Sequence, residues 1–441
     1  MSQFNIKQNY SNVKLKIAAT ILCLIPFTLA LGTFLPEIFF IISFLILSKE
    51  IYFKKNKYFN NTLFKVFLFF YFYVLFNSII QIFSWGKDYI FSVYCGDFFN
   101  CAKIYFFDQK SIIFFFRYYF YMVVLWYLFD TYKKFINYFY FSIMISITII
   151  GIDALIQYIT GTNLIGIERI NLHRLSGIFN DEFILGSYYL RMYFIFFGLF
   201  IFLNNFKERK TFYYFILINL FFLILIFLSG ERSAFFLFIF SLFFSFIFLK
   251  KIKLKFFLNC ILILFISVTF ISFFDGNIRD RIFNETIDKF SNKTNGQIYI
   301  FTEVHHGHYM SAKLMFRENP FFGVGPKQFE KRCKDIKYHY YKQRCATHPH
   351  NYYIQLFSET GIFGGLFLVF TIFYILYRLL KSLAHKKTTF TDNDVLNFFL
   401  IGFLVFLWPV VPHGNFFNNW IIMSSLISLS FFKHYSYKIN N

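Results

Sequence analysis

The chain contains 441 residues, of which 57% are hydrophobic and only 15% are charged, and its formal net charge is +21. Soluble domains carry about 25% charged residues, so this composition excludes an ordinary soluble domain and indicates a membrane protein. The positive charge does not indicate nucleic-acid binding, because the cations occur in short runs between apolar segments, as in the loops of membrane proteins.

Twelve apolar segments approach the length of about 20 residues that a helix needs to cross a bilayer. They predict an all-α, polytopic membrane protein with about twelve transmembrane helices. The first two segments lie so close together that we expect a tight hairpin broken near Pro36. The segments are 17–35, 36–53, 62–84, 111–131, 136–158, 183–205, 212–229, 234–249, 256–274, 352–380, 394–411 and 418–432.

Basic residues follow each even-numbered segment, so the positive-inside rule places these loops and both termini in the cytoplasm. The three longest remaining loops, 85–110, 159–182 and 275–351, then lie outside. The basic residues are Lys54, Lys55, Lys57, Lys133, Lys134, Lys207, Arg209, Lys210, Lys250, Lys251, Lys253, Lys255, Lys381, Lys386, Lys387, Lys433 and Lys438.

Four cysteines lie in the loops assigned to the outside, and none lies in a cytoplasmic loop. An oxidising outer compartment would permit the local bridges Cys95–Cys101 and Cys333–Cys345. The alternative is four free thiols.

The loop 275–351 is rich in charge and histidine and is expected to contain short helices. Residues 277–293 and 309–318 have helical patterns, and the second helix should stop at Asn319-Pro320. The following PFFGVGP, residues 320–326, is interpreted as turns near the membrane surface. It is not a nucleotide-binding glycine loop, because the required strand and helix do not flank it.

A polar stripe begins directly after this loop. Asn351, Gln355 and Glu359 are spaced so that a helix places all three on one face. Ionisable groups at this membrane depth almost always face a bundle interior or a wet cavity, and His348 and His350 stand at the helix entrance. We expect Gly361, Gly364 and Gly365 to let a neighbouring helix approach closely. In the alternative structural interpretation, Asn351 caps the helix, the glycines pack, and Glu359 pairs with a lysine.

An arginine occurs at membrane depth in LSGERSAFF, residues 228–236, between two adjacent apolar segments. Arg232 needs an anionic partner there. Glu231 could supply one as a buried pair, and a bound diphosphate could supply another, since the arginine fork fits phosphate oxygens bidentately. The residues alone do not decide between these two.

A further cation, Arg174, lies beside His173 in the outer loop before the sixth segment, in RLSGIFND. Asp181 and Glu182 follow it. As an isolated motif this loop would be interpreted as solvated charge.

Five histidines share the largest loop, which raises the possibility of a metal site: His305, His306, His308, His348 and His350. Zinc sites favour spacings such as HExxH with acidic or cysteine neighbours. The run His-His-x-His lacks that spacing, so we expect no metal.

Taken together, these stretches resemble the O-antigen ligase and O-antigen polymerase superfamily. HPHNYYIQLFSETGIFGG is similar to the family signature of a His-Asn pair before a helix with a glutamate and Gly-x-x-Gly. RLSGIFND, SGERSAFF and AKLMFRENPFFGVGPKQF resemble three further family segments in order and spacing. The resemblance covers about 170–380, and divides the chain into N-terminal helices (1–169), a ligase-like core (170–380) and C-terminal helices (381–441).

The resemblance implies a GT-C-like glycosyltransferase of the bacterial inner membrane, acting on the periplasmic face without a metal or other cofactor. The donor would be a glycan on undecaprenyl diphosphate. A ligase passes this glycan to a sugar hydroxyl of the lipid A core, and a polymerase passes it to another lipid-linked glycan. We expect the ligase, because the large loop ends directly in the HPHN stretch.

The resemblance also assigns roles to residues. His350 is the expected catalytic base, assisted by Glu359, and Arg232 and Arg174 are expected to hold the diphosphate. Further substrate-binding candidates are His348, Asn351, Gln355, His305 and Glu231.

The chain departs from the family at one arginine, which is expected about fifteen residues before the Asn-Pro turn. His305 lies near that position, so either His305 or one of Arg317, Arg332 and Arg344 would replace it.

The polar residues would also be compatible with two functions from other classes. One is a transporter with a proton relay of Glu359 and histidines, and the other is a structural scaffold. The first lacks the symmetric broken helices of many transporters, and the second does not require polar groups on one face.

Overall fold

The computed structural model describes residues 2–85, 112–203, 209–249, 254–291, 302–338, 345–383 and 392–440. These residues form helices and turns without a named strand, which confirms the all-α prediction. The elements are α1 (Ser2–Cys23), α2 (Ile25–Thr28), α3 (Phe34–Phe53), α4 (Lys55–Phe59), α5 (Thr62–Trp85), η1 (Phe114–Phe116), α8 (Arg117–Thr131), α9 (Lys134–Thr160), η2 (Gly177–Phe179), α10 (Leu185–Leu203), α11 (Arg209–Leu228), α12 (Arg232–Phe248), α13 (Leu254–Phe274), α14 (Gly276–Arg279), η3 (Asp280–Asn284), α15 (Glu285–Ser291), α16 (Glu303–Glu318), α17 (Phe329–Cys333), α18 (Tyr352–Leu383), α19 (Asp392–Phe406) and α20 (Asn419–Asn440).

Each predicted apolar segment overlaps at least one of these helices. Within the described residues, 5 helices are long and apolar enough to cross a membrane. This confirms a membrane protein with several candidate spans, and the count of about twelve remains a prediction. The five are Thr62–Gln81, Lys134–Thr160, Leu185–Leu203, Phe257–Phe274 and Tyr352–Leu383.

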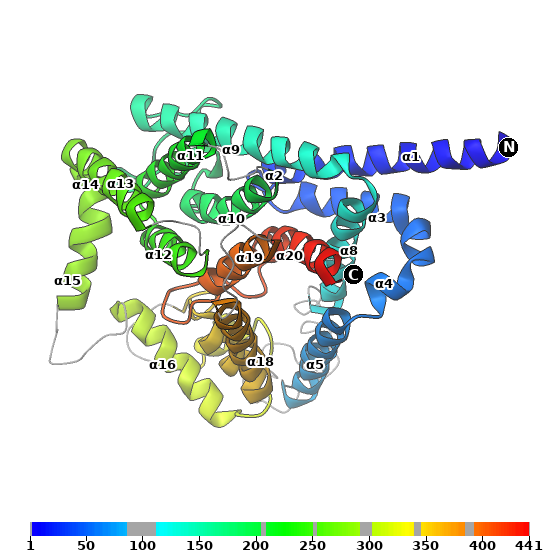
Figure 1. Cartoon of the computed structure of the whole chain (residues 1–441). Coiled ribbons are helices and arrows are strands. Elements are labelled where there is room, and N and C mark those ends of the chain that lie inside the picture. The colour runs from blue at the N-terminus through cyan, green and yellow to red at the C-terminus, as the bar shows by residue number, and fades with distance from the viewer. Residues whose placement is uncertain are drawn as a thin grey trace.

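The predicted N-terminal hairpin is present, with different boundaries. Helix α1 ends at Cys23, earlier than expected, and the short α2 precedes the turn that leads to α3. Pro36 lies in the first turn of α3, where a missing backbone N–H costs nothing. Helices α1 and α3 pack side by side (Figure 1).

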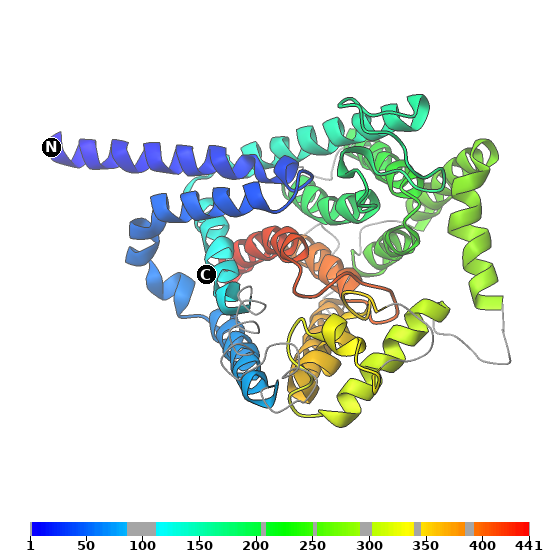
Figure 2. The same cartoon turned by 180° about the vertical axis from the view of Figure 1, so that it is seen from behind.

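Helix α10 packs against α9, α11, α12, α19 and α20, and Figure 2 shows it between α9 and the helices α19 and α20. Nearly all of its residues are buried, as expected for a helix that is apolar all round. It therefore touches helices from all three predicted sections of the chain. The division at residues 169 and 380 remains a prediction.

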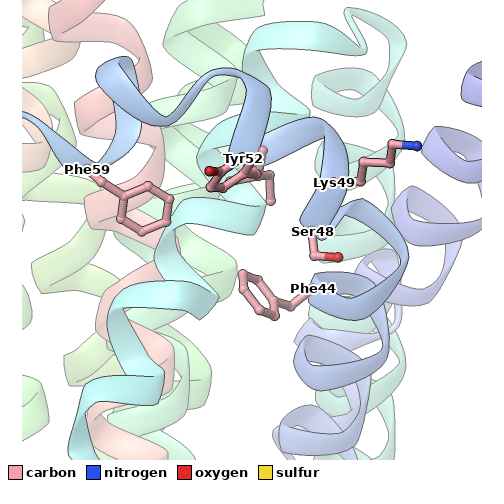
Figure 3. A pocket seen from close by; sticks show the side chains of 6 residues that line it. Phe44, Ser48, Lys49, Tyr52 and Phe59 are labelled. Carbon is pink, nitrogen blue, oxygen red and sulfur yellow. The ribbon is translucent and has the colours of Figure 1, made fainter.

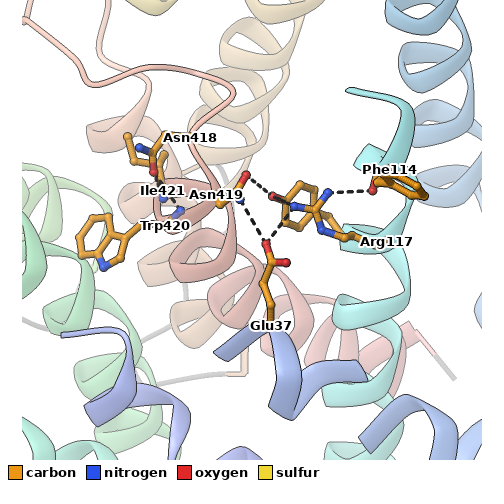
Figure 4. A network of polar contacts seen from close by, with 8 residues as sticks. Glu37, Phe114, Arg117, Asn418, Asn419, Trp420 and Ile421 are labelled. Carbon is orange, nitrogen blue, oxygen red and sulfur yellow. Dashed lines mark hydrogen bonds and ion pairs between the residues drawn. The ribbon is translucent and has the colours of Figure 1, made fainter. Parts of the chain in front are cut away.

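A polar network ties α3, α8 and α20 together (Figure 4). The carboxylate of Glu37 pairs with Arg117 at 2.9 Å and accepts a hydrogen bond from the side-chain amide of Asn419 at 3.2 Å. The hydroxyl of Tyr118 donates to Asn419 at 2.7 Å. Ionisable groups between packed membrane helices are tolerated when they pair in this way.

Helix α18 is broken at Gly361, where φ is 71° and ψ is −167°. The loop 319–325 fills the break, because the N–H of Val324 donates to Ser358 at 2.9 Å and the N–H of Ile362 donates to Pro320 at 2.8 Å. From the other side, Gln81 of α5 donates to the carbonyl of Gly323 at 2.8 Å. At Gly361 the closely approaching neighbour is therefore this loop, whereas we expected a helix.

The predicted short elements of the large loop are largely confirmed. Helix α16 ends at Glu318, directly before Asn319-Pro320, but begins at Glu303, so it also contains His305, His306 and His308. A disulfide joins Cys333 to Cys345, which confirms that pairing. The predicted Cys95–Cys101 bridge lies outside the described residues.

The break in α18 yields a stability prediction. A Cβ added at Gly361 would lie 2.1 Å from the carbonyl oxygen of Phe321, whereas one at Gly166, which also has positive φ, meets nothing within 4 Å. Both Gly→Ala variants incur the left-handed backbone penalty of about 1–3 kcal/mol. We expect Gly361→Ala to lose a further amount on the order of 1–3 kcal/mol from overpacking.

Thermal unfolding of the purified full chain in detergent measures the difference. The Tm of Gly361→Ala should lie clearly below that of Gly166→Ala. Equal Tm values would show that the loop does not depend on the broken helix.

Candidate functional site

A cavity of about 580 Å³ collects cationic and histidine side chains from distant parts of the chain. Its walls come from the loop before α10 and the start of α12. The segment from η3 to α15, the start of α16 and His350 before α18 also contribute. The lining residues are Arg174, Glu231, Arg232, Ser233, Phe236, Phe240, Arg281, Thr286, Thr302, His305, His350, Val410, Val411 and Pro412.

The arginine wall is built around a turn at Gly230. This glycine has φ +65°, and a Cβ there would lie 2.2 Å from the carbonyl oxygen of His173. Only glycine allows the loop that carries Arg174 to come so close. Arg232 begins α12 two residues later, so the two predicted arginines line the same cavity.

Glu231 does not serve as the counter-ion of Arg232. Its carboxylate accepts hydrogen bonds from the N–H of Ser187 at 3.1 Å and from the Ser187 hydroxyl at 2.6 Å. Arg232 instead lies 3.7 Å from the carboxylate of Glu285. The alternative interpretation of a local Arg232–Glu231 pair is therefore wrong, because the carboxylate at the turn points toward α10.

Arg281 is a third arginine of this wall, and the sequence interpretation missed it. Its Nε donates to the carbonyl of Gly230 at 3.0 Å, and its Nη1 lies 3.6 Å from Glu285. The sequence signal that could have indicated Arg281 is its position soon after the apolar segment 256–274, on the outer side. The positive-inside rule predicts few basic residues there. The sequence pattern of residues 277–293 predicted only a short helix there.

The arginines impose a strong positive potential on the cavity. Burial lowers the pKa of Arg174 to about 10, Glu231 opposes this shift, and the charges of Arg281 and Arg232 add to it. Arg174 still carries its charge at neutral pH. Its Nη2 donates to the carbonyl of Phe183 at 2.8 Å, and its buried Nε has no hydrogen-bond partner among the described residues. An anion in the cavity would relieve this crowding of like charges.

His350 lines the same cavity as the arginines. It adopts φ +57°, a left-handed conformation that is uncommon for a residue with a side chain and often marks functional sites. Its carbonyl accepts a hydrogen bond from the N–H of His413 at 2.8 Å. Its ring centre lies 5.2 Å from that of His305 and 4.2 Å from that of His348.

The imidazole of His350 is suited to accept a proton. Burial lowers its pKa below the usual range, while a hydrogen bond with the backbone of His413 opposes the shift. A neutral imidazole keeps one ring nitrogen as a hydrogen-bond and proton acceptor.

His348 is less available than His350. Its Nδ1 lies 2.9 Å from the Thr347 hydroxyl and its Nε2 lies 3.2 Å from the carbonyl of His413, so both ring nitrogens are engaged. Burial, reinforced by the neighbouring histidines, lowers its pKa to about 4. It packs behind His350 and does not line the cavity.

The stripe of Asn351, Gln355 and Glu359 lies on one buried face of α18, as predicted. That face meets protein backbone and not the cavity. Asn351 accepts hydrogen bonds at the helix start and donates to the carbonyl of Pro409 at 2.8 Å. Gln355 donates to Glu359 at 3.0 Å, and Glu359 accepts from the N–H of Phe329 at 3.1 Å. The expectation that this stripe faces a wet cavity is thus not met at the cavity described above, and the alternative that Asn351 caps the helix is confirmed.

Of the proposed substitutes for the missing family arginine, His305 lines the cavity. Arg317 is exposed, and neither it nor Arg332 belongs to the lining. Arg344 lies outside the described residues. Arg281 is the guanidinium that the fold brings to this wall.

Among the described residues, no group of three or more His, Cys, Asp or Glu side chains could hold a metal ion.

A second cavity of about 410 Å³ lies between α3 and α4 (Figure 3). Its walls are mainly aromatic and aliphatic, with Lys49 as the single cation among the residues that line it, so it lacks a comparable set of chemical groups.

The structure is thus that of a helical membrane protein with a cavity lined by arginine and histidine side chains. A family model described as O-Antigen ligase matches residues 217–369. This match supports the assignment of the chain to the O-antigen ligase and polymerase superfamily, as the motifs predicted. The matched range includes Arg232, Arg281, His305 and His350, but not Arg174. A search of curated proteins found no match.

The protonation state of His350 can be measured directly. Because burial lowers its pKa, we expect its titration midpoint to fall below the ordinary value of about 6.5. The experiment is an NMR titration of the full chain labelled at its histidines, with His350→Ala used to assign the signal. A midpoint at or above 6.5 would contradict the neutral proton acceptor.

Proposed function

We propose that this protein is an O-antigen ligase-type glycosyltransferase. It would transfer a glycan from undecaprenyl diphosphate to a sugar hydroxyl of the lipid A core. The observation that carries the proposal is that Arg174, Arg232 and His350 line one cavity. The reaction would take place on the periplasmic face of the bacterial inner membrane, with both termini in the cytoplasm, in line with the distribution of basic loops.

The chemistry needs one base and one anion-binding wall. His350 would take the proton of the acceptor hydroxyl as its oxygen attacks the anomeric carbon of the donor sugar. The bond from that carbon to the diphosphate oxygen would break in the same step, with inversion. Arg174 and Arg232 would stabilise the charge that develops on the departing undecaprenyl diphosphate.

The apolar side of the cavity supports a lipid-linked donor. Phe236, Phe240 and Val410 line the cavity and remain partly exposed, at 38%, 40% and 67%. Phe236 and Phe240 belong to α12, whose remaining length is apolar. A prenyl chain could follow this helix into the bilayer while its diphosphate stays beside the arginines.

The remaining predicted residues would support the site from behind. Glu359 accepts a hydrogen bond from the backbone N–H of Phe329 and so holds the start of α17. Helix α17 packs against α16, the helix that carries His305. Gln355 accepts the N–H of Phe416 at 2.9 Å and helps to fix the segment after α19. His348 shares the carbonyl of His413 with His350. We therefore assign these residues to positioning and keep the catalytic role for His350.

The family match is shared by ligases and polymerases, so the product decides between them. Deletion of the gene should leave free lipid-linked polymer and bare lipid A core on a gel of surface glycans if the protein is a ligase. Single-repeat products after deletion would instead identify the polymerase.

In the same assay, His350→Ala should abolish glycan transfer while the protein level remains normal. Loss of a general base costs roughly 10²–10⁴-fold in rate. His306→Ala is the matched control, because His306 is a partly buried histidine of α16 outside the cavity lining, and its transfer should stay near normal. Normal capping of the core in His350→Ala would refute the catalytic assignment.

A further inference from the structure

Glu285 stands between two arginines of the cavity wall. Its carboxylate lies 3.7 Å from Arg232 Nη1 and 3.6 Å from Arg281 Nη1. Within the described residues, Arg232 makes no hydrogen bond and has this single ion pair. The two guanidinium groups are thus held by one carboxylate.

The local backbone explains why Arg281 reaches the cavity. Residues 280–284 form a single π-helical turn, η3, and such turns are frequent at functional sites. Arg279, two residues earlier, points to solvent with a side chain 47% exposed, whereas the side chain of Arg281 is 21% exposed. The bond from Arg281 Nε to Gly230 leaves its two Nη groups directed away from that anchor.

The ion pairs of Glu285 with Arg232 and Arg281 are too long to be strong. Charge-assisted hydrogen bonds between nitrogen and carboxylate oxygen span about 2.7–2.9 Å, and both distances here are greater. Glu285 is also 35% exposed, and partly solvated ion pairs contribute little net stability. A phosphate group can therefore displace this carboxylate, because it offers more oxygens and more charge to the same two forks.

We propose that Arg281 is a third diphosphate-binding arginine and that Glu285 is an internal counter-ion, which holds Arg232 and Arg281 until the diphosphate replaces it. The inference rests on the proposed function, since it assigns residues to the same anion site. It also provides the guanidinium that the chain lacks at the position of His305.

We expect the cavity to bind a lipid diphosphate more tightly than a lipid monophosphate. Three arginines around one cavity match two phosphate groups better than one. Glu285 opposes any anion, so a monophosphate gains less than a diphosphate when it displaces the carboxylate. Arg281 should therefore contribute more to the binding of the diphosphate.

The test is calorimetric titration of the purified full chain in detergent with geranylgeranyl diphosphate, and with geranylgeranyl monophosphate for comparison. Arg281→Gln should weaken diphosphate binding roughly tenfold or more, as expected for loss of a hydrogen bond between charged groups. The affinity of Arg281→Lys for the diphosphate should lie between those of the parent chain and Arg281→Gln, because lysine keeps the charge but lacks the guanidinium fork. Glu285→Gln should tighten binding several-fold at low salt.

Matched controls are Arg279→Gln and Glu330→Gln, which change the same charges at exposed positions outside the cavity lining. Both should bind the diphosphate like the parent chain. If Arg232→Gln weakens binding but Arg281→Gln resembles Arg279→Gln, the role of Arg281 is refuted and the proposed function stands. If neither Arg232→Gln nor Arg281→Gln changes binding, the diphosphate site itself is refuted. Weaker or unchanged binding by Glu285→Gln would overturn the counter-ion role.

Discussion

The close contact between Gly230 and the backbone of His173 determines the rest of the site. A side chain at Gly230 would displace the loop that carries Arg174, and the carbonyl of the same glycine anchors Arg281. Arg232 follows two residues later. One turn thus gathers three guanidinium groups from segments far apart in the sequence. Such a concentration of positive charge at the end of a membrane helix is costly without an anion.

A second set of contacts, made by backbone segments, holds His350 in a left-handed conformation. The N–H of His413 holds the carbonyl of His350 at 2.8 Å, and Asn351 ties the start of α18 to Pro409. Farther along α18, the break at Gly361 receives the loop after α16. His350 and the arginines are therefore positioned by different segments of the chain, and they line one cavity.

The sequence predicted the all-α fold class because helices depend on local patterns, and the roles of the site residues remain predictions. Apolar length identified the helices, and the motifs around Arg174, Arg232 and His350 identified residues that line one cavity. The sequence did not reveal Arg281, because its approach to the cavity depends on a π-helical turn and on a contact with Gly230. It also could not show that Glu231 bonds to Ser187 or that Glu359 faces backbone, since both depend on how distant segments pack.

The most direct test of the account is an electron cryomicroscopy structure of the full chain with undecaprenyl diphosphate bound. The account predicts both phosphates between Arg174, Arg232 and Arg281, with the prenyl chain along Phe236 and Phe240 on α12. Phosphate density outside this cavity would contradict the account, and so would a diphosphate that leaves these arginines without contact.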